Sequence, residues 1–368
     1  MMSQVSQRLD SLDYLRGVAA FYVVAHHLSE FQYASDLHID LPFRKLLVLG
    51  FLGVDIFFVL SGFVMAHGYR ERLRMPGALL PYARARFARL APLHFLTTLI
   101  LLAIVLAMSS QVPIALPRFD HTWLGWNILN LQGIIPNQSN WNYPSWSISF
   151  EMVAYILFPA ALVLLRKHPG VVFALGMATT TIFYVWIRRY HPTDFDLTTY
   201  GVGALVRSVG LFMAGAALRE LWDVPVTRKL ASGWGIYALL FIWLVGAILT
   251  GLPKAWMTWI APIGLLWAQG SGWLKRLPFA PVLKWLGDIS FSIYLIHALV
   301  EYTVGGALTA WNGGTAPHFA GAPAIGIFAG CIALILLLGT LSFRYIERPA
   351  QNLINGRNRR QPVTAASL

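Results

Sequence analysis

The stretch LDYLRGVAAFYVVAHHLS, residues 12–29, is long enough to cross the hydrocarbon core of a membrane as one α-helix. Within it, Arg16 and His27 are eleven residues apart, which is three helical turns plus about 20°, so both side chains lie on one face. At about 1.5 Å per residue, they are separated by about 16 Å along the helix axis. The sequence thus predicts an arginine and a histidine aligned about half a bilayer apart.

The composition indicates an integral membrane protein. Of the 368 residues, 57% are hydrophobic and 12% are charged, whereas soluble domains carry about 25% charged residues. Apolar runs of membrane-spanning length recur along the chain, and in lipid such runs form helices because unpaired backbone groups are costly there. We predict an all-α, polytopic membrane bundle of about ten transmembrane helices at residues 12–29, 46–69, 82–109, 145–165, 170–187, 200–219, 232–250, 254–271, 282–306 and 323–346.

The basic residues predict the orientation of this bundle. Cytoplasmic loops of membrane proteins carry an excess of lysine and arginine. If both termini are cytoplasmic, only Arg207 falls within a span, and the outer side receives Arg44, Lys45, Arg118, Arg188, Arg189 and Lys254. We therefore interpret the net charge of +12 as a topology signal of the cytoplasmic (inner) membrane and expect no nucleic acid partner.

No soluble domain is expected outside the bundle. Residues 1–350 are predicted to form the membrane domain, and residues 351–368 a disordered cytoplasmic tail. The first helix does not resemble a cleavable signal peptide, since it carries Asp13, Arg16 and paired histidines and no small-residue cleavage site follows. The single cysteine, Cys331, offers neither an intrachain disulfide nor a cysteine metal site, and we predict no metal.

Four ionisable residues are predicted to share a depth in the membrane. Counting along the helices places His27, Asp55, Glu151 and His297 in its middle or outer half, where ionisable side chains are functional candidates. His27 is the candidate general base, because imidazole changes charge near neutral pH, and Glu151 or Asp55 is expected to orient its ring. The alternatives are hydrogen bonds within the bundle and, for Asp55, a structural ion pair.

The stretch from Arg70 to Pro92, which is expected to be cytoplasmic, is rich in arginine. Arg86 and Arg89 lie on one helical face, and guanidinium groups match phosphate oxygens, so an anionic nucleotide is expected to dock here. Topology signalling and contact with anionic lipid headgroups are the alternative interpretation.

Other polar and small residues have assignments of their own. Trp146 and Ser147 open the fourth helix and, together with Tyr294 and His297 on the ninth, are candidate substrate contacts. A capped helix start is the alternative for Ser147, which lies one turn from Glu151. Small residues let membrane helices approach closely, which is the predicted role of Gly53, Ser61 and Gly62.

The connection at about residues 110–144 is rich in aromatic residues and is expected to lie outside. An interfacial aromatic belt accounts for most of them, and stacking against sugar rings is the alternative. They are Trp123, Trp126, Trp141 and Tyr143.

Six segments, in order, resemble the acyltransferase-3 family of membrane acyltransferases over nearly the whole chain. They are Arg16 with His27, Gly53-Val54-Asp55-Ile56-Phe57-Phe58-Val59-Leu60-Ser61-Gly62-Phe63, Arg86-Phe87-Ala88-Arg89-Leu90-Ala91-Pro92, Trp146-Ser147-Ile148-Ser149-Phe150-Glu151, Ser292-Ile293-Tyr294-Leu295-Ile296-His297, and Arg344-Tyr345-Ile346-Glu347-Arg348-Pro349.

This resemblance implies a bundle of about ten helices that transfers an acyl group, usually acetyl, from cytoplasmic acyl-CoA to an outward-facing hydroxyl of a surface glycan or related acceptor. It assigns the family's arginine and histidine pair to Arg16 and His27 and its paired arginines to Arg86 and Arg89. Many relatives carry another basic residue where this chain has Ala85. Some relatives append an esterase-like domain, and no such segment is found in this sequence, so the protein is expected to act alone or with a separate periplasmic partner protein.

Resemblance and residue chemistry together predict a mechanism. The phosphates of acyl-CoA bind Arg86, Arg89 and Arg16, the thioester reaches His27, and His27 acts as general base or as transient acyl carrier. A proton-coupled secondary transporter that uses the buried His, Asp and Glu residues is the rival class. The acceptor remains open between a polysaccharide, a lipid-linked sugar, a lipo-oligosaccharide and a small glycoside.

Overall fold

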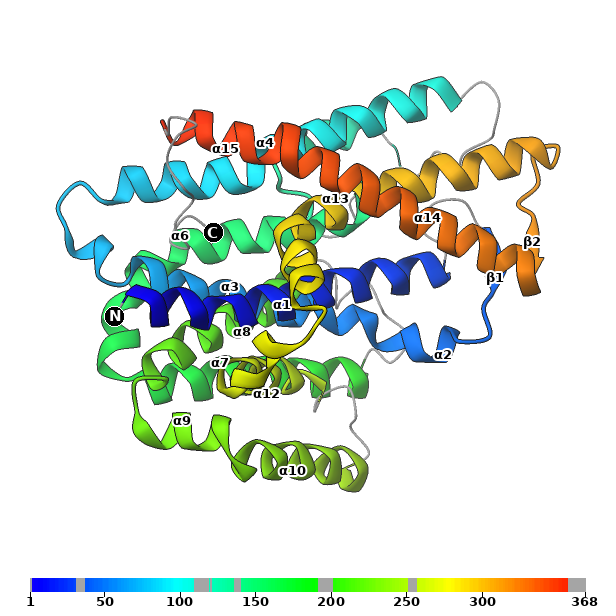
Figure 1. Ribbon diagram of the computed structural model, residues 1–368. Helices are drawn as coiled ribbons and strands as arrows, with labels where there is room; N and C mark the ends of the chain where they lie inside the picture. The colour runs from blue at the N-terminus through cyan, green and yellow to red at the C-terminus, as the bar shows by residue number, and fades with distance from the viewer. Residues whose placement is uncertain are drawn as a thin grey trace.

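The computed structural model describes residues 2–30, 37–108, 119, 121–135, 140–190, 201–250 and 257–356. Long helices lie roughly side by side in this part of the chain, which confirms the all-α class (Figure 1). Each of the ten predicted helices has a counterpart: α1 Met2–Glu30, α3 Leu52–Tyr69, α4 Leu79–Met108, α6 Trp146–Lys167, α7 Pro169–Tyr190, α8 Gly201–Leu221, α10 Trp234–Thr250, α12 Ile260–Gly270, α13 Ala280–Trp311 and α14 Gly321–Ser342.

Short elements connect the long helices. They include a parallel two-stranded sheet, β1 His38–Asp40 with β2 His318–Ala320, that joins the segment after α1 to the start of α14. The short helices are α2 Arg44–Leu47, α5 Leu124–Ile128, α9 Pro225–Ser232 and α15 Arg348–Ile354, and 3-10 turns lie at Val48–Phe51, Arg72–Arg74, His121–Trp123, Tyr143–Ser145 and Gly272–Arg276.

The chain is a multi-pass membrane protein, although the predicted number of ten spans is not confirmed. Among the described residues, seven helices are long and apolar enough to cross a membrane, or eight if α9 and α10, which meet at 76°, form one span. The helix α1 is not among them, because Asp13, Arg16 and two histidines make it more polar. The α12 helix falls short because it has 11 residues.

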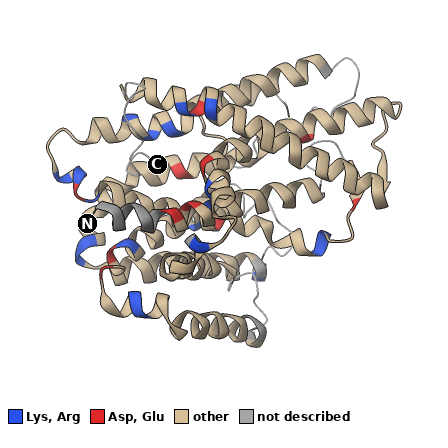
Figure 2. Cartoon of the chain, viewed as in Figure 1, with Lys and Arg blue, Asp and Glu red and all other residues tan. Residues whose placement is uncertain are grey.

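Charge is distributed unevenly along the bundle. Lysine and arginine gather toward the end where α1 begins and α15 lies, whereas the opposite end shows a basic patch at α2 (Figure 2). This pattern agrees with the predicted topology, in which Arg44 and Lys45 are outside. The cytoplasmic location of the basic end stays a prediction, and residues 357–368 of the predicted tail lie outside the described residues.

Small residues let the central helices approach closely. A Cβ atom on Gly17 of α1 would lie 2.5 Å from the backbone nitrogen of Gly287 on α13, and one on Gly53 would lie 2.7 Å from the carbonyl oxygen of Ala19. A Cβ atom on Gly62 of α3 would overlap the carbonyl oxygen of Phe212 on α8. The predicted packing roles of Gly53 and Gly62 are confirmed, and α1, α3 and α13 are held together at the centre.

Candidate active site

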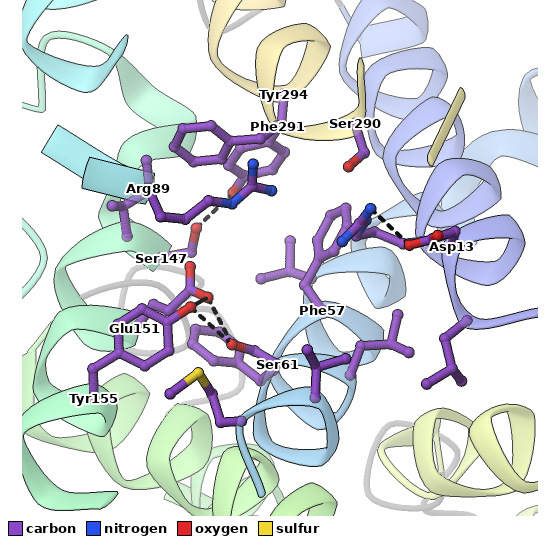
Figure 3. Close-up of a pocket in the computed structure, with 18 residues that line it drawn as sticks. Asp13, Phe57, Ser61, Arg89, Ser147, Glu151, Tyr155, Ser290, Phe291 and Tyr294 are labelled. Carbon is purple, nitrogen blue, oxygen red and sulfur yellow. Dashed lines mark hydrogen bonds and ion pairs between the residues drawn. The ribbon is translucent and has the colours of Figure 1, made fainter. Parts of the chain in front are cut away.

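A cavity opens between α1, α3, α4, α6 and α13. It holds about 870 Å³ of empty space, counting its opening to the outside, and both polar and apolar side chains line it. Among the predicted site residues, it brings together Arg16, Arg89, Ser147, Glu151 and Tyr294, and Figure 3 labels the last four. A concave space with this mixed polar and apolar lining is typical of a small-molecule binding site.

Arg16 lines this cavity from α1 and is held firmly in place. Its Nη2 atom donates to Asp13 Oδ1 at 2.8 Å and to the Gly287 carbonyl oxygen at 3.0 Å. Asp13 in turn accepts from Lys284 of α13 at 2.6 Å. The Gly287 carbonyl and the Asp13 carboxylate therefore fix the direction of the Arg16 guanidinium. The close approach of Gly17 to Gly287 makes this geometry possible.

Arg89 lies across the cavity on α4 and is neutralised by Glu347. The two form an ion pair, and Ser292 donates to the second carboxylate oxygen of Glu347 at 2.6 Å. Glu347 ends a π-helical turn, Phe343–Glu347, between α14 and α15. Such single turns often occur at functional sites. The Arg89 guanidinium also lies 4.8 Å from the Phe291 ring centroid.

Arg86 is buried one helical turn from Arg89, in different surroundings. Its guanidinium donates to the Tyr69 hydroxyl at 3.0 Å and lies over the rings of Tyr69 and Tyr155, at 5.0 and 5.5 Å from their centroids. It is 4% exposed, and no carboxylate among the described residues pairs with it. Arg86 does not line the cavity itself, but it contacts Met65 and Tyr155, which do.

Glu151 forms part of the cavity wall on α6. It accepts hydrogen bonds from the Ser61 hydroxyl at 2.7 Å and from the Tyr155 hydroxyl at 2.5 Å (Figure 3). Ser61, which was predicted to serve helix packing, lines the cavity and donates to this carboxylate. Its hydroxyl therefore has a polar contact that the packing prediction did not include.

The substrate-contact candidates divide into two groups. Ser147 and Tyr294 line the cavity, and their hydroxyl oxygens are 2.8 Å apart, while Tyr294 donates to the Pro144 carbonyl oxygen at 2.7 Å. Trp146 packs against the Phe150 ring and is not a lining residue. His297 is fully buried and also outside the lining.

His27 and His297 form a hydrogen-bonded pair with nearly parallel rings beyond the cavity lining. The Nδ1 atom of His27 lies 3.0 Å from Nε2 of His297, and the two ring planes differ by 6°. Tyr294 connects the pair to the cavity, since its ring centroid lies 5.9 Å from that of His297. The expectation that Glu151 or Asp55 orients His27 was wrong, because His297 occupies Nδ1 and both carboxylates lie against other partners.

Tyr143 and Glu301 complete the surroundings of the two histidines. Tyr143 was predicted only as a belt or sugar-stacking residue, and Glu301 was not singled out in the sequence. The Tyr143 ring stands nearly perpendicular to both imidazoles, and its hydroxyl donates to Glu301 Oε2 at 2.5 Å. Glu301 follows His297 by four residues on α13 and is fully buried. A buried acid one turn from a histidine was the available signal.

The structure describes part of the connection at about residues 110–144, which was expected to lie outside. Not all of its aromatic residues have the exposure expected of an interfacial aromatic belt. Trp141 is buried, with its ring centroid 5.5 Å from that of Phe119, and Tyr143 faces the histidines. Trp126, by contrast, is 39% exposed, as a belt residue would be. Residues 109–118, 120 and 136–139 lie outside the described residues.

Asp55 contacts a different part of the bundle and takes no part in the cavity wall. It forms an ion pair with Arg207 of α8, both side chains are buried, and the Arg207 guanidinium also lies over the Tyr184 ring. Asp55 does not line the cavity. Its surroundings match the structural ion pair that was the alternative to a catalytic role.

These features define the class: a membrane helix bundle with an arginine-lined cavity and a histidine pair. The chain belongs to the acyltransferase-3 family, since residues 9–343 match the family model described as an acyltransferase domain. It is therefore a membrane acyltransferase. In the part of the chain that the structure describes, no cluster of three His, Cys, Asp or Glu residues could hold a metal ion.

The chain is also similar to several named proteins. The chain is 28% identical to acyltransferase MdmB of Streptomyces mycarofaciens, with 98% of this chain and 95% of that protein covered. It is 27% identical to the exopolysaccharide production protein ExoZ of Rhizobium meliloti, covering 86% and 93% respectively. It is 24% identical to the peptidoglycan O-acetyltransferase OatA of Listeria monocytogenes, covering 92% of this chain but 55% of OatA. No solved structure matches the chain.

Proposed function

We propose that this protein transfers an acyl group, with acetyl favoured by the family, from cytoplasmic acyl-CoA to a hydroxyl of a glycan or glycolipid on the far side of the inner membrane. The observation that carries the proposal lies on α1, which is one unbroken helix from Met2 to Glu30. That helix directs Arg16 into the cavity at one level and places His27 against His297 about 16 Å further along.

Three arginines favour an anionic donor. Arg16 and Arg89 line the cavity from opposite sides, and Arg86 adds a buried positive charge that no described carboxylate offsets. A buried cation without a counter-charge is costly, so an incoming phosphate has a favourable place near it. The phosphates of acyl-CoA, entering at the basic end, supply that charge, and the pantetheine arm is long enough to bring the thioester toward His27.

The reaction that we propose is acyl transfer from sulfur to oxygen. His27 removes the proton of the acceptor hydroxyl, and the oxygen attacks the thioester carbonyl carbon. The carbon–sulfur bond then breaks, and the CoA thiolate takes the proton back from His27. The His27 lone pair that accepts this proton would also let His27 attack the thioester itself and carry the acyl group for a time. The transfer would then proceed in two steps.

The acceptor class rests on the relatives. ExoZ is named for exopolysaccharide production and OatA for O-acetylation of peptidoglycan. Both names refer to glycans, and the name of OatA refers to O-acetylation, so by analogy we propose a hydroxyl group of a surface glycan or a glycolipid as the acceptor here. A separate periplasmic partner that aids the transfer belongs to the same proposal.

The test compares two neighbouring histidines. His27→Ala should abolish acetylation of surface glycans, measured as a loss of the acetyl mass increment by mass spectrometry. His26→Ala, a matched change of the preceding residue whose ring lies near Phe51, should retain it. Full acetylation by His27→Ala would remove His27 from the reaction. Binding of CoA to the purified protein separates an acyltransferase of this kind from a proton-coupled transporter.

A further inference from the structure

The hydrogen-bond chain behind His27 defines which of its nitrogens carries a proton. His297 Nδ1 lies 3.3 Å from the carbonyl oxygen of Ile293, one turn earlier on α13. A carbonyl oxygen only accepts hydrogen bonds, so Nδ1 of His297 is the donor there. In a neutral imidazole the other nitrogen then bears a lone pair, and Nε2 of His297 is an acceptor.

The same reasoning applies to the His27 ring. Nε2 of His297 lies 3.0 Å from Nδ1 of His27, so Nδ1 of His27 must supply the hydrogen. The neutral His27 ring therefore holds its lone pair on Nε2, the nitrogen turned away from His297.

We propose that His297 is a positioning residue that fixes His27 in the Nδ1-protonated tautomer and makes Nε2 the reactive nitrogen. This inference rests on the proposed function, because it concerns how His27 is prepared for transfer. It gives His297 a role other than the substrate contact expected from the sequence. A fully buried side chain outside the cavity lining suits this role better than contact with a substrate.

Other groups keep the two rings from rotating. The His27 and His297 planes differ by 6°, and the Tyr143 ring stands at 89° and 84° to them. Glu301 accepts from the Tyr143 hydroxyl, so one face of α13 supplies the Ile293 carbonyl, the His297 ring and the carboxylate that anchors Tyr143. A fixed base costs less reorganisation during the reaction.

The arrangement also suits the step after proton removal. When Nε2 of His27 takes the proton of the acceptor hydroxyl, the ring becomes an imidazolium. Its Nδ1–H then donates to Nε2 of His297 as a charge-assisted hydrogen bond, which is stronger than the neutral one. The proton returns from Nε2 to the leaving thiolate, and His297 ends unchanged.

Two substitutions of similar size separate positioning from packing. His297→Gln places an amide oxygen near the position of Nε2, where it can accept from His27. His297→Asn keeps a donor near Nδ1 for the Ile293 carbonyl but does not reach His27. The purified full-length protein in lipid nanodiscs is given acetyl-CoA and surface glycan from the producing cells, and the release of CoA thiol is measured.

We expect His297→Gln to retain kcat within about 10-fold and His297→Asn to lose about 100-fold or more, since a wrong tautomer costs about 10⁴-fold in a serine protease. The Kd for CoA should stay within about threefold in both variants, which reports an intact fold. Equal activity of the Gln and Asn variants would overturn the inference while leaving His27→Ala inactive and the proposed function intact. Full activity of His27→Ala would overturn both.

A direct measurement needs no substitution at His297. In ¹⁵N-histidine-labelled protein, the nitrogen chemical shifts distinguish protonated from unprotonated ring nitrogens, and the His27 signals are those missing from His27→Ala. Neutral His27 should show a protonated Nδ1 and an unprotonated Nε2. The opposite pattern would overturn the inference even if every variant were inactive.

Discussion

Arg86 and Arg89 lie one helical turn apart on α4, yet among the described residues only Arg89 is paired with a carboxylate. Glu347 neutralises Arg89, whereas tyrosine rings and a tyrosine hydroxyl surround Arg86. Aromatic faces attract a cation but do not cancel its charge. The two arginines therefore have different surroundings in the site, although one short stretch of the sequence, Arg86-Phe87-Ala88-Arg89, contains both.

The first prediction concerns CoA affinity. Arg86→Gln removes the buried charge and should weaken CoA binding by about 10- to 100-fold, since a hydrogen bond to a charged group is worth about 1.5–3 kcal/mol. Arg84→Gln is the matched control, because Arg84 is an exposed arginine on the same helix whose described contact is the Asn355 carbonyl oxygen. Titration calorimetry of the purified protein with CoA measures both. Equal weakening in the two variants would indicate a general surface charge effect.

The second prediction concerns the Arg89 and Glu347 pair. Glu347→Leu leaves the Arg89 charge in a largely buried place and should destabilise the protein by about 3–5 kcal/mol. Arg89→Leu together with Glu347→Leu removes both charges, so the double variant should unfold at a higher temperature than the Glu347 variant alone. Thermal unfolding in detergent gives the comparison. Additive losses in the double variant would show that the pair contributes little.

The helices were predictable from the sequence, and their membrane-spanning number was less so. Ten apolar stretches became ten helices because the hydrocarbon requires backbone hydrogen bonds within each segment. Two of these helices, α1 and α12, lack the composition or the length of a membrane span. The α1 helix carries Asp13, Arg16 and two histidines and is not among the helices apolar enough to span, and α12 has 11 residues where a span needs about 20.

Some of the predicted site residues meet at one cavity, but the pairings within the site were not predictable. Arg16, Arg89, Ser147, Glu151 and Tyr294 do share one cavity. The partner of His27, however, comes from α13, 270 residues away, and no periodicity within one helix reveals such a contact. Arg207 is a similar case: it stood out as the one basic residue within a span, yet nothing in the sequence joined it to Asp55.

The third prediction tests whether Asp55 is structural. Asp55→Ala removes the carboxylate that pairs with the buried Arg207 guanidinium, so the amount of folded protein in the membrane should fall severalfold. The acyl transfer rate per folded molecule should change by less than about threefold, because Asp55 does not line the cavity. Asp55→Leu with Arg207→Leu should recover much of the folded amount. If the Asp55→Ala protein reaches normal levels in the membrane but its acyl transfer rate per folded molecule falls well below this limit, Asp55 is catalytic after all.

The fourth prediction uses two glycines in helices. Gly62 lies on α3 where a Cβ atom would overlap the Phe212 backbone of α8, so Gly62→Ala must push the two helices apart. Overpacking of this kind costs about 1–3 kcal/mol, and α3 also carries Ser61 of the cavity wall, so acyl transfer should fall with stability.

Gly264 on α12 provides the control for that change. A Cβ atom there meets nothing within 4 Å, and alanine favours a helix over glycine by about 1 kcal/mol, so Gly264→Ala should keep or raise the unfolding temperature. Because both substitutions add one methyl group inside a helix, the difference between them isolates the contact of α3 with α8. Equal unfolding temperatures for the two variants would mean that these helices can separate slightly without cost, and that the position of Ser61 in the cavity does not depend on Gly62.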